Sequence, residues 1–111
     1  MNFKKFDIII VDFPFSNLSQ TKRRPVLVIK DAGGNNIILC QITTKRRNIQ
    51  KYEIILNKES CNGDIRFNSF IYVDMIFTLH NNLIHRQIGE VSNQKLKDEI
   101  NLKLKEILND D

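Results

Sequence analysis

Apolar and polar positions alternate along the chain in short blocks, and these blocks predict a series of β-strands. Strands are expected at residues 8–13, 25–29, 37–42, 52–56, 69–74 with a continuation to 79 after a bend, and 83–88. Polar loops are expected at 16–23 and 45–51, and an irregular stretch at 57–68. The Gly33-Gly34 pair accepts positive φ and should reverse the chain between the second and third strands.

The period of the apolar positions changes near the C-terminus. Apolar residues recur there at helical spacing, with lysines and acids between them: Leu96, Ile100, Leu104, Ile107 and Leu108. Ser92 is the expected N-cap, and Val91 and Leu96 have the spacing of a hydrophobic staple. We therefore expect an amphipathic helix whose apolar stripe packs on the sheet.

The number of short strands favours a curled sheet over a flat one. In a chain of 111 residues, a flat sheet would leave its two edge strands exposed, whereas partial closure into a small barrel protects these edges. No repeat or linker divides the sequence, so one domain is expected over residues 1–111. The predicted fold class is mainly β, a small, partly open β-barrel followed by one helix.

Charge is unevenly distributed between the strand-rich part and the helix. Residues 1–88 carry 13 Lys/Arg against 7 Asp/Glu, a balance of +6, and residues 89–111 carry 4 against 6, a balance of −2. The positive excess of the strand-rich part favours a polyanion or an acidic protein as its partner. A lysine-rich, merely soluble surface is the alternative.

Two isolated cysteines and the N-terminal sequence indicate the compartment. Cys40 and Cys61 lie in no Cys-x-x-Cys spacing, and residues 1–7 do not read as a signal peptide. No apolar run is long enough to span a bilayer. We expect a cytoplasmic protein with reduced cysteines and no contact with a membrane.

Two basic clusters flank the second and third predicted strands. Lys22-Arg23-Arg24 precedes the second strand, and Lys45-Arg46-Arg47 follows the third, beside Thr43 and Thr44. If these strands pair as a hairpin, both clusters meet at one end of the sheet. Guanidinium groups bind phosphate bidentately and hydroxyls donate to its oxygens, so this end should bind phosphate. The alternative is two solvated loop ends.

The remaining chemistry-bearing residues form weaker patterns. His80 and His85 lie five residues apart across an expected turn, which suits either acid–base cleavage of RNA or an ordinary surface. Together with Asp74 they would supply three metal ligands, but their spacing is not diagnostic of a metal site. The sequence has no Gly-rich phosphate loop and no Gly-x-Ser-x-Gly pattern, and no cofactor is expected.

Several segments, in order, resemble the MazF/PemK toxins. Ile10-Val11-Asp12-Phe13-Pro14-Phe15, then a polar loop and residues 22–29, resemble the N-terminal signature of that family. Gln41-Ile42-Thr43 is similar to its second signature. Residues 72–74, 77–79 and 86–89 with the terminal helix resemble its C-terminal half.

This resemblance implies a dimeric, SH3-like barrel endoribonuclease that cuts single-stranded mRNA at short sequences without a metal. A cognate acidic antitoxin would silence it, and DNA would be contacted only through that antitoxin. The family's catalytic arginine and threonine correspond to Arg24 and Thr43. The residues expected to bind RNA are Gln20, Lys22, Arg23, Thr44, Lys45, Arg46, Arg47 and Asp74.

Two departures from the family pattern and two rival functions accompany the resemblance. Phe6-Asp7 replaces the Gly-Asp of many members, and Tyr72 stands where some members carry an arginine. The gyrase-poisoning CcdB toxins have a similar fold but rely on a tryptophan near the C-terminus, and this sequence contains no tryptophan. A non-catalytic RNA-binding barrel is the second rival.

Overall fold

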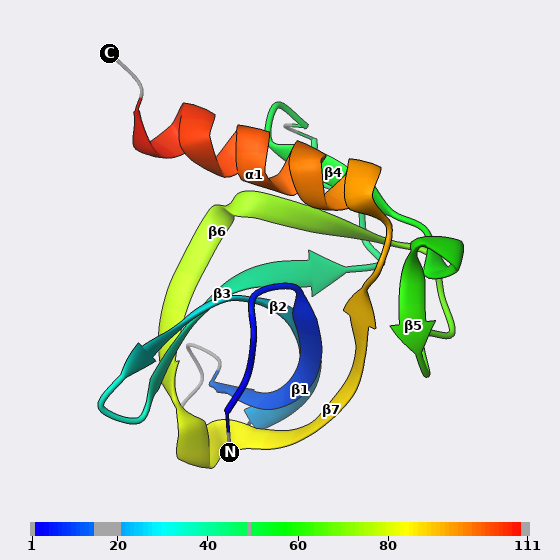
Figure 1. Cartoon of the computed structure of the whole chain (residues 1–111). Helices are drawn as coiled ribbons and strands as arrows, with labels where there is room; N and C mark the ends of the chain where they lie inside the picture. Colours follow the sequence, from blue (N-terminus) through cyan, green and yellow to red (C-terminus); the bar gives the residue numbers. More distant parts are fainter. Residues whose placement is uncertain (1, 15–20, 49, 110–111) are drawn as a thin grey trace.

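The computed structural model describes residues 2–14, 21–48 and 50–109. Within them the chain forms seven strands, two 3-10 turns and one α-helix (Figure 1). The strands are β1 (Asp7–Pro14), β2 (Thr21–Gly33), β3 (Asn36–Thr43), β4 (Glu53–Leu56), β5 (Cys61–Gly63), β6 (Ser69–His80) and β7 (Ile84–Val91). The 3-10 turns cover Lys58–Ser60 and Asn81–Leu83, and the helix α1 covers Gln94–Leu108.

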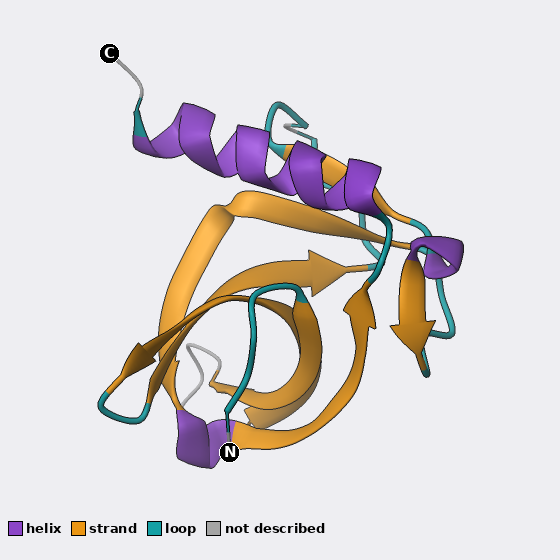
Figure 2. Cartoon of the chain, in the orientation of Figure 1, coloured by secondary structure: helices purple, strands orange, loops and turns teal. Residues whose placement is uncertain are grey.

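The strands form one antiparallel sheet in the order β4-β6-β3-β2-β1-β7-β5. The sheet curls on itself, with α1 lying across it next to β6 (Figure 2). An irregularity in β6 contributes to the curl, because Cys40 of β3 pairs with Ile76 whereas the next residue, Gln41, pairs with Tyr72. Such a bulge bends a strand and increases its twist. The mainly β fold with a C-terminal helix is thereby confirmed.

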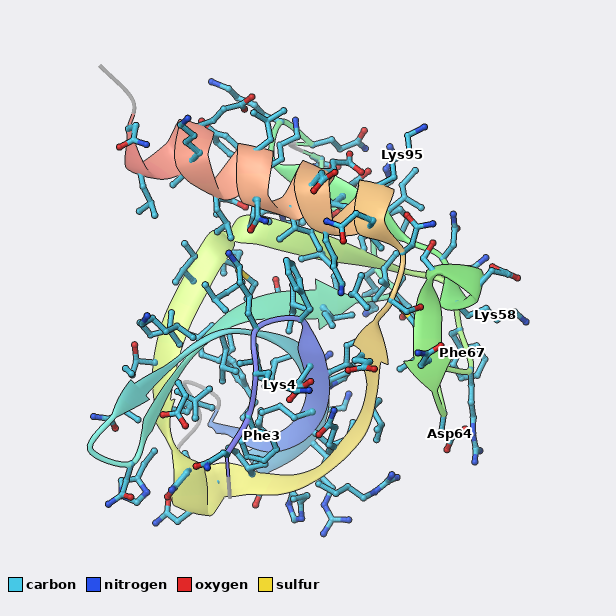
Figure 3. The ribbon with its side chains drawn as sticks, in the orientation of Figure 1. Phe3, Lys4, Lys58, Asp64, Phe67 and Lys95 are labelled. Carbon is cyan, nitrogen blue, oxygen red and sulfur yellow. The ribbon has the colours of Figure 1, made fainter. Side chains whose placement is uncertain are left out.

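Alternate residues of the strands enter two apolar clusters. One cluster includes Leu27 of β2 and the buried Ile100 of α1. The other includes Val26 and Val28 of β2 together with Phe3, which lies within the curve of β1 and β7 (Figure 3). Since successive strand residues point to opposite faces, both faces of β2 are buried. This explains why residues 25–29 of β2 form a continuous apolar run.

Two strand assignments differ from the sequence prediction. β2 begins at Thr21 instead of Pro25, because the polar residues before Pro25 continue the ladder to β1 as far as the pair Thr21 and Pro14. The stretch expected to be irregular contains β5, which pairs with the last residues of β7. In both cases pairing with another strand imposes strand structure on a sequence with weak strand propensity.

The expected N-cap of the helix was wrong by one residue. The side chain of Asn93, not of Ser92, accepts a hydrogen bond from the backbone amide of Leu96, at 2.9 Å. The Ser92 hydroxyl instead donates to the Ser60 carbonyl at 3.2 Å. The expected helical stripe is present at Leu96, Ile100 and Leu104, which are buried, but it does not extend to Leu108, which is 72% exposed. No helix in the described part of the chain is long and apolar enough to cross a bilayer.

Candidate active site

The pairing of β2 with β3 places the two basic clusters at the same end of the sheet. The two strands are antiparallel, and the register pairs Val26 with Gln41 at the end of their ladder. Extending that register by two residues puts Arg24 across from Thr43. Paired residues of a sheet point to the same face, so these two side chains belong to one face of the sheet.

Pro25 opens a pocket between these strands. Proline has no backbone N–H to donate, and the β2–β3 ladder accordingly ends at Val26. A small pocket of about 60 Å³ lies beyond the end of this ladder, and it is lined by Phe13, Arg24, Pro25, Val26, Gln41 and Ile42. The half-buried Arg24 is thus part of a pocket wall rather than an exposed loop. The sequence analysis named Phe13 and Gln41 as parts of the two family signatures but did not predict either as a site residue.

The Thr43 hydroxyl is oriented by the turn that follows β3. Its Oγ1 accepts a hydrogen bond from the Lys45 backbone amide at 3.1 Å. A hydroxyl that accepts in this way retains its proton for donation. Thr43 is half-buried, and the neighbouring Thr44 and Lys45 are exposed. The arrangement provides a neutral hydrogen-bond donor on the same face as Arg24.

Arg46 is neutralised by a buried carboxylate. Its Nε lies 3.0 Å from both carboxylate oxygens of Glu53, and the Glu53 side chain is only 4% exposed. This hydrogen bond lowers the pKa of the Glu53 carboxyl and raises the pKa of Arg46. The guanidinium also lies 5.5 Å from the ring centroid of Phe70, the residue that pairs with Thr43. Arg46 therefore covers the strand next to Thr43.

Arg47 is held against Tyr72. Its guanidinium lies 4.0 Å from the ring centroid of Tyr72, and its Nη2 is 2.7 Å from Asp74 Oδ1. Tyr72 pairs with Gln41, so Arg47 lies over the strand adjacent to the pocket. The Nε of Arg47 is buried without a hydrogen-bond partner among the described residues. Asp74 thus positions Arg47 in this structure.

Tyr72 connects the basic loop to the sheet. Its side chain is fully buried, and its hydroxyl accepts from the Arg47 backbone amide at 2.7 Å and donates to Glu53 Oε2 at 2.8 Å. The residue standing where some relatives have an arginine is therefore an organising group for the loop that carries Arg46 and Arg47. The β4–β6 register, which pairs Glu53 with Tyr72, creates this contact. No local sequence pattern predicts it.

Tyr72→Phe should destabilise the protein by about 1–3 kcal/mol, because the Arg47 amide and the Glu53 carboxylate each lose a hydrogen-bond partner in a buried setting. Urea unfolding monitored by circular dichroism measures the change. The matched control is Tyr52→Phe, at a half-buried tyrosine whose hydroxyl has no hydrogen-bond partner among the described residues. Equal unfolding midpoints for the two variants would contradict the organising role of Tyr72.

Arg23 belongs to a separate polar cluster. Its Nε lies 3.2 Å from His85 Nε2, which is 2.7 Å from Asp12 Oδ1. Asp12 pairs with Arg23 and Val11 with Arg24, so the two arginines point to opposite faces of β2. Arg23 and the exposed Lys22 flank the site without entering the pocket. Gln20 and the rest of 16–20 lie outside the described residues.

The two histidines do not form a pair. His80 Nδ1 accepts from the Asn82 backbone amide at 3.1 Å and caps a 3-10 turn, whereas His85 contacts Asp12. Asp74 is bonded to Arg47. Across the ranges that the structure describes, no three His, Cys, Asp or Glu side chains are grouped as metal ligands.

The cysteines are unbridged and lie outside the site. Cys40 is buried and Cys61 is half-buried. Burial raises the pKa of the Cys40 thiol to about 12 and that of Cys61 to about 11. Both thiols therefore remain protonated at neutral pH and are poor nucleophiles.

Comparison with known protein families gives a match over nearly the whole chain. The sequence profile described as PemK-like, MazF-like toxin of type II toxin-antitoxin system matches residues 4–108. A comparison with curated proteins finds no match.

Solved structures of low sequence identity share the fold. A MazE–MazF complex from Deinococcus radiodurans matches with a TM-score of 0.74 and 18% identity, covering 96% of each chain. A mycobacterial endoribonuclease in complex with its cognate antitoxin gives 0.72 and 17%, covering 96% of this chain and 95% of that one. The Mycobacterium tuberculosis toxin MazF-mt6 gives 0.68 and 20%, covering 95% and 98%. With the profile spanning nearly its whole length, the chain belongs to the PemK-like, MazF-like toxins of type II toxin–antitoxin systems.

Proposed function

We propose that this toxin is an endoribonuclease that cleaves single-stranded mRNA at short sequences and thereby inhibits growth. One observation supports the proposal: the β2–β3 register, extended two residues past its last pair, puts Arg24 and Thr43 on one face of the sheet, and Arg24 lines a pocket there. Membership of the toxin family supports it, and two structurally similar proteins are described as endoribonucleases.

RNA supplies its own nucleophile, the 2′-hydroxyl, which attacks the adjacent phosphorus and expels the 5′ oxygen. The enzyme must align these atoms, allow the 2′-hydroxyl to lose its proton, stabilise the additional negative charge of the phosphorane and allow the leaving 5′ oxygen to gain a proton. Arg24 offers two parallel donors to the charged oxygens. Thr43 donates its hydroxyl proton to a non-bridging oxygen, because its Oγ1 already accepts from Lys45. The products are a 2′,3′-cyclic phosphate and a 5′-hydroxyl, and no metal or cofactor takes part.

The exposed basic residues around the pocket track the flanking phosphates. Lys22, Arg23, Thr44 and Lys45 are exposed beside the pair Arg24 and Thr43. Arg46 and Arg47 contribute less net charge than the sequence suggests, because Glu53 and Asp74 neutralise them. Their role in this proposal is to shape the surface next to the pocket and to offer the remaining guanidinium donors to RNA. Gln20, in the segment 16–20, is proposed to contact the RNA.

The protein acts in the cytoplasm as a homodimer of a single 1–111 toxin domain and is silenced by an acidic antitoxin. The relatives from Deinococcus radiodurans and from a mycobacterial species were solved with their antitoxins. The balance of +6 over residues 1–88 suits an acidic partner. A flexible acidic segment can cover a basic groove and exclude RNA.

The test is an analysis of products from a synthetic single-stranded RNA incubated with the purified toxin and excess EDTA. We expect cleavage at a few sites, with each upstream fragment ending in a 2′,3′-cyclic phosphate, as identified by mass spectrometry. Binding without cleavage would instead support the non-catalytic RNA-binding barrel. Cleavage that stops in EDTA and returns with a divalent ion would overturn the proposed mechanism.

A further inference from the structure

The side-chain amide of Gln41 lies beside the proposed catalytic groups and could bind a ligand. Gln41 is half-buried and lines the pocket together with Arg24 and Phe13. Its amide has no hydrogen-bond partner among the described residues. By contrast, Tyr72, which pairs with Gln41 across β3 and β6, donates a hydrogen bond to Glu53 on the next strand, β4. A partly buried amide carries two donors and one acceptor that favour a partner. The pocket therefore offers hydrogen bonds that the protein itself does not use.

The aromatic wall of the pocket is held in a fixed orientation. Phe13 packs edge-to-face against Phe77, with ring centroids 5.0 Å apart and an interplanar angle of 82°. The partner ring lies on β6, which is separated from β1 in the sheet by β2 and β3. Phe13 thus joins an ordered aromatic pair at the pocket rather than a free surface ring. Aromatic rings beside amides are the combination with which proteins bind unstacked bases of single-stranded RNA.

We infer that this pocket receives the edge of one nucleobase next to the scissile phosphate, and that Gln41 is the residue that determines which base is accepted. The inference rests on the proposed endoribonuclease function. A second phosphate is a poor occupant, because the amide of Gln41 is neutral and Arg24 is assigned to the scissile group. A purely apolar group would leave the amide unpaired at the cost of a buried hydrogen bond.

The chemistry of an amide predicts how the preference changes with substitution. An amide presents a donor and an acceptor side by side, which matches the edge of adenine bidentately. A carboxylate presents acceptors only and pairs with the amino group of cytosine. Gln41→Glu should therefore move the preference at this position from adenine toward cytosine, and Gln41→Leu should abolish the preference.

The experiment is competitive cleavage of an RNA pool randomised around a known cut site, with relative kcat/KM values read by sequencing. Wild type should favour one base at the position next to the cut by about 5- to 150-fold. Gln41→Leu should reduce this ratio to nearly 1 while cleavage continues. Gln87→Leu is the matched control, since its amide donates to the Gly89 carbonyl at 3.1 Å on β7, away from the pocket. The control should keep the wild-type preference.

The outcomes separate this inference from the function on which it rests. If wild type cleaves but Gln41→Leu and Gln41→Glu both retain its base preference, the reading role of Gln41 is wrong and the endoribonuclease proposal stands. If wild type cleaves no RNA of the pool, the proposed function fails instead. Gln41→Glu preserves the size of the side chain. If thermal melting shows that Gln41→Leu folds poorly, the base preference of Gln41→Glu alone tests the role of Gln41.

Discussion

Arg24→Ala should slow single-turnover RNA cleavage by about 10²–10³, the usual cost of removing one preorganised donor to a developing oxyanion. The residue before a proline is confined to extended conformations, so Pro25 restricts the backbone of Arg24. The half-buried side chain lines the pocket and lies in register with Thr43. Rates measured at saturating enzyme isolate the chemical step from binding. RNA affinity should fall only modestly, because the surrounding basic residues remain.

Matched variants distinguish a positioned guanidinium from positive charge in general. Arg24→Lys should remain slow, because a point charge does not reproduce the planar fork. Arg23→Ala is the closest control, since Arg23 is adjacent in sequence but contacts His85 on the other face of β2. It should weaken binding and leave the single-turnover rate nearly unchanged. The single-turnover rate of Thr43→Ala should lie between the rates of Arg24→Ala and Arg23→Ala.

One pattern of variant activities would place the catalytic site at a histidine instead of at Arg24. Near-full single-turnover activity of Arg24→Ala, together with an inactive His85→Ala or His80→Ala, would transfer catalysis to a histidine. We expect both histidine variants to be nearly neutral in the chemical step. His80 caps a turn and His85 faces Asp12, so neither lines the pocket.

A single 2′-deoxy sugar at the cut site should abolish cleavage of an otherwise unchanged RNA. The proposed nucleophile is the 2′-hydroxyl of the substrate, and without it no internal attack on phosphorus can occur. The expected effect exceeds that of any single side-chain change, because the reaction loses a reactant rather than one stabilising contact. Gel analysis of an end-labelled oligonucleotide measures it directly.

The position of the modified sugar provides the control. A 2′-deoxy sugar two nucleotides from the cut should leave cleavage close to that of all-ribose RNA. Equal cleavage of the all-ribose RNA and the RNA modified at the cut would show that water or a protein group is the nucleophile. Binding of both RNAs, compared by fluorescence anisotropy, should be similar, because phosphate contacts dominate the affinity.

The elements of the fold follow from local sequence patterns. Buried strands appear as β-branched apolar runs, and the terminal helix appears as a stripe at helical spacing, because each period is set by the backbone geometry of its own segment. The placement of Arg24 and Thr43 at the same end of the sheet could also be expected, since it needs only one hairpin between consecutive strands with a glycine-rich turn. Both inferences depend on residues close together in the chain.

The surroundings of the site depend on pairings between distant strands. If β6 continued the register that pairs Cys40 with Ile76, Gln41 would face Met75. The irregularity after Cys40 shifts that register by three residues and brings Tyr72 opposite Gln41 instead. The hydroxyl of Tyr72 then forms hydrogen bonds with Glu53 and the Arg47 amide. These bonds hold the loop that carries Arg46 and Arg47, two residues that the sequence alone would place in solvent.

The sequence by itself determined most of the strands, the helix and the placement of two basic clusters at one end of the sheet, but not β5 or the start of β2. Only the tertiary structure decided which charges are neutralised and where a pocket opens. Arg46 and Glu53 are seven residues apart, but Arg47 and Asp74 are 27 apart, and the pocket joins side chains from three strands. The physical reason is that a side chain's face and partners are set by inter-strand register, and a bulge changes that register without leaving a periodic signal in either strand.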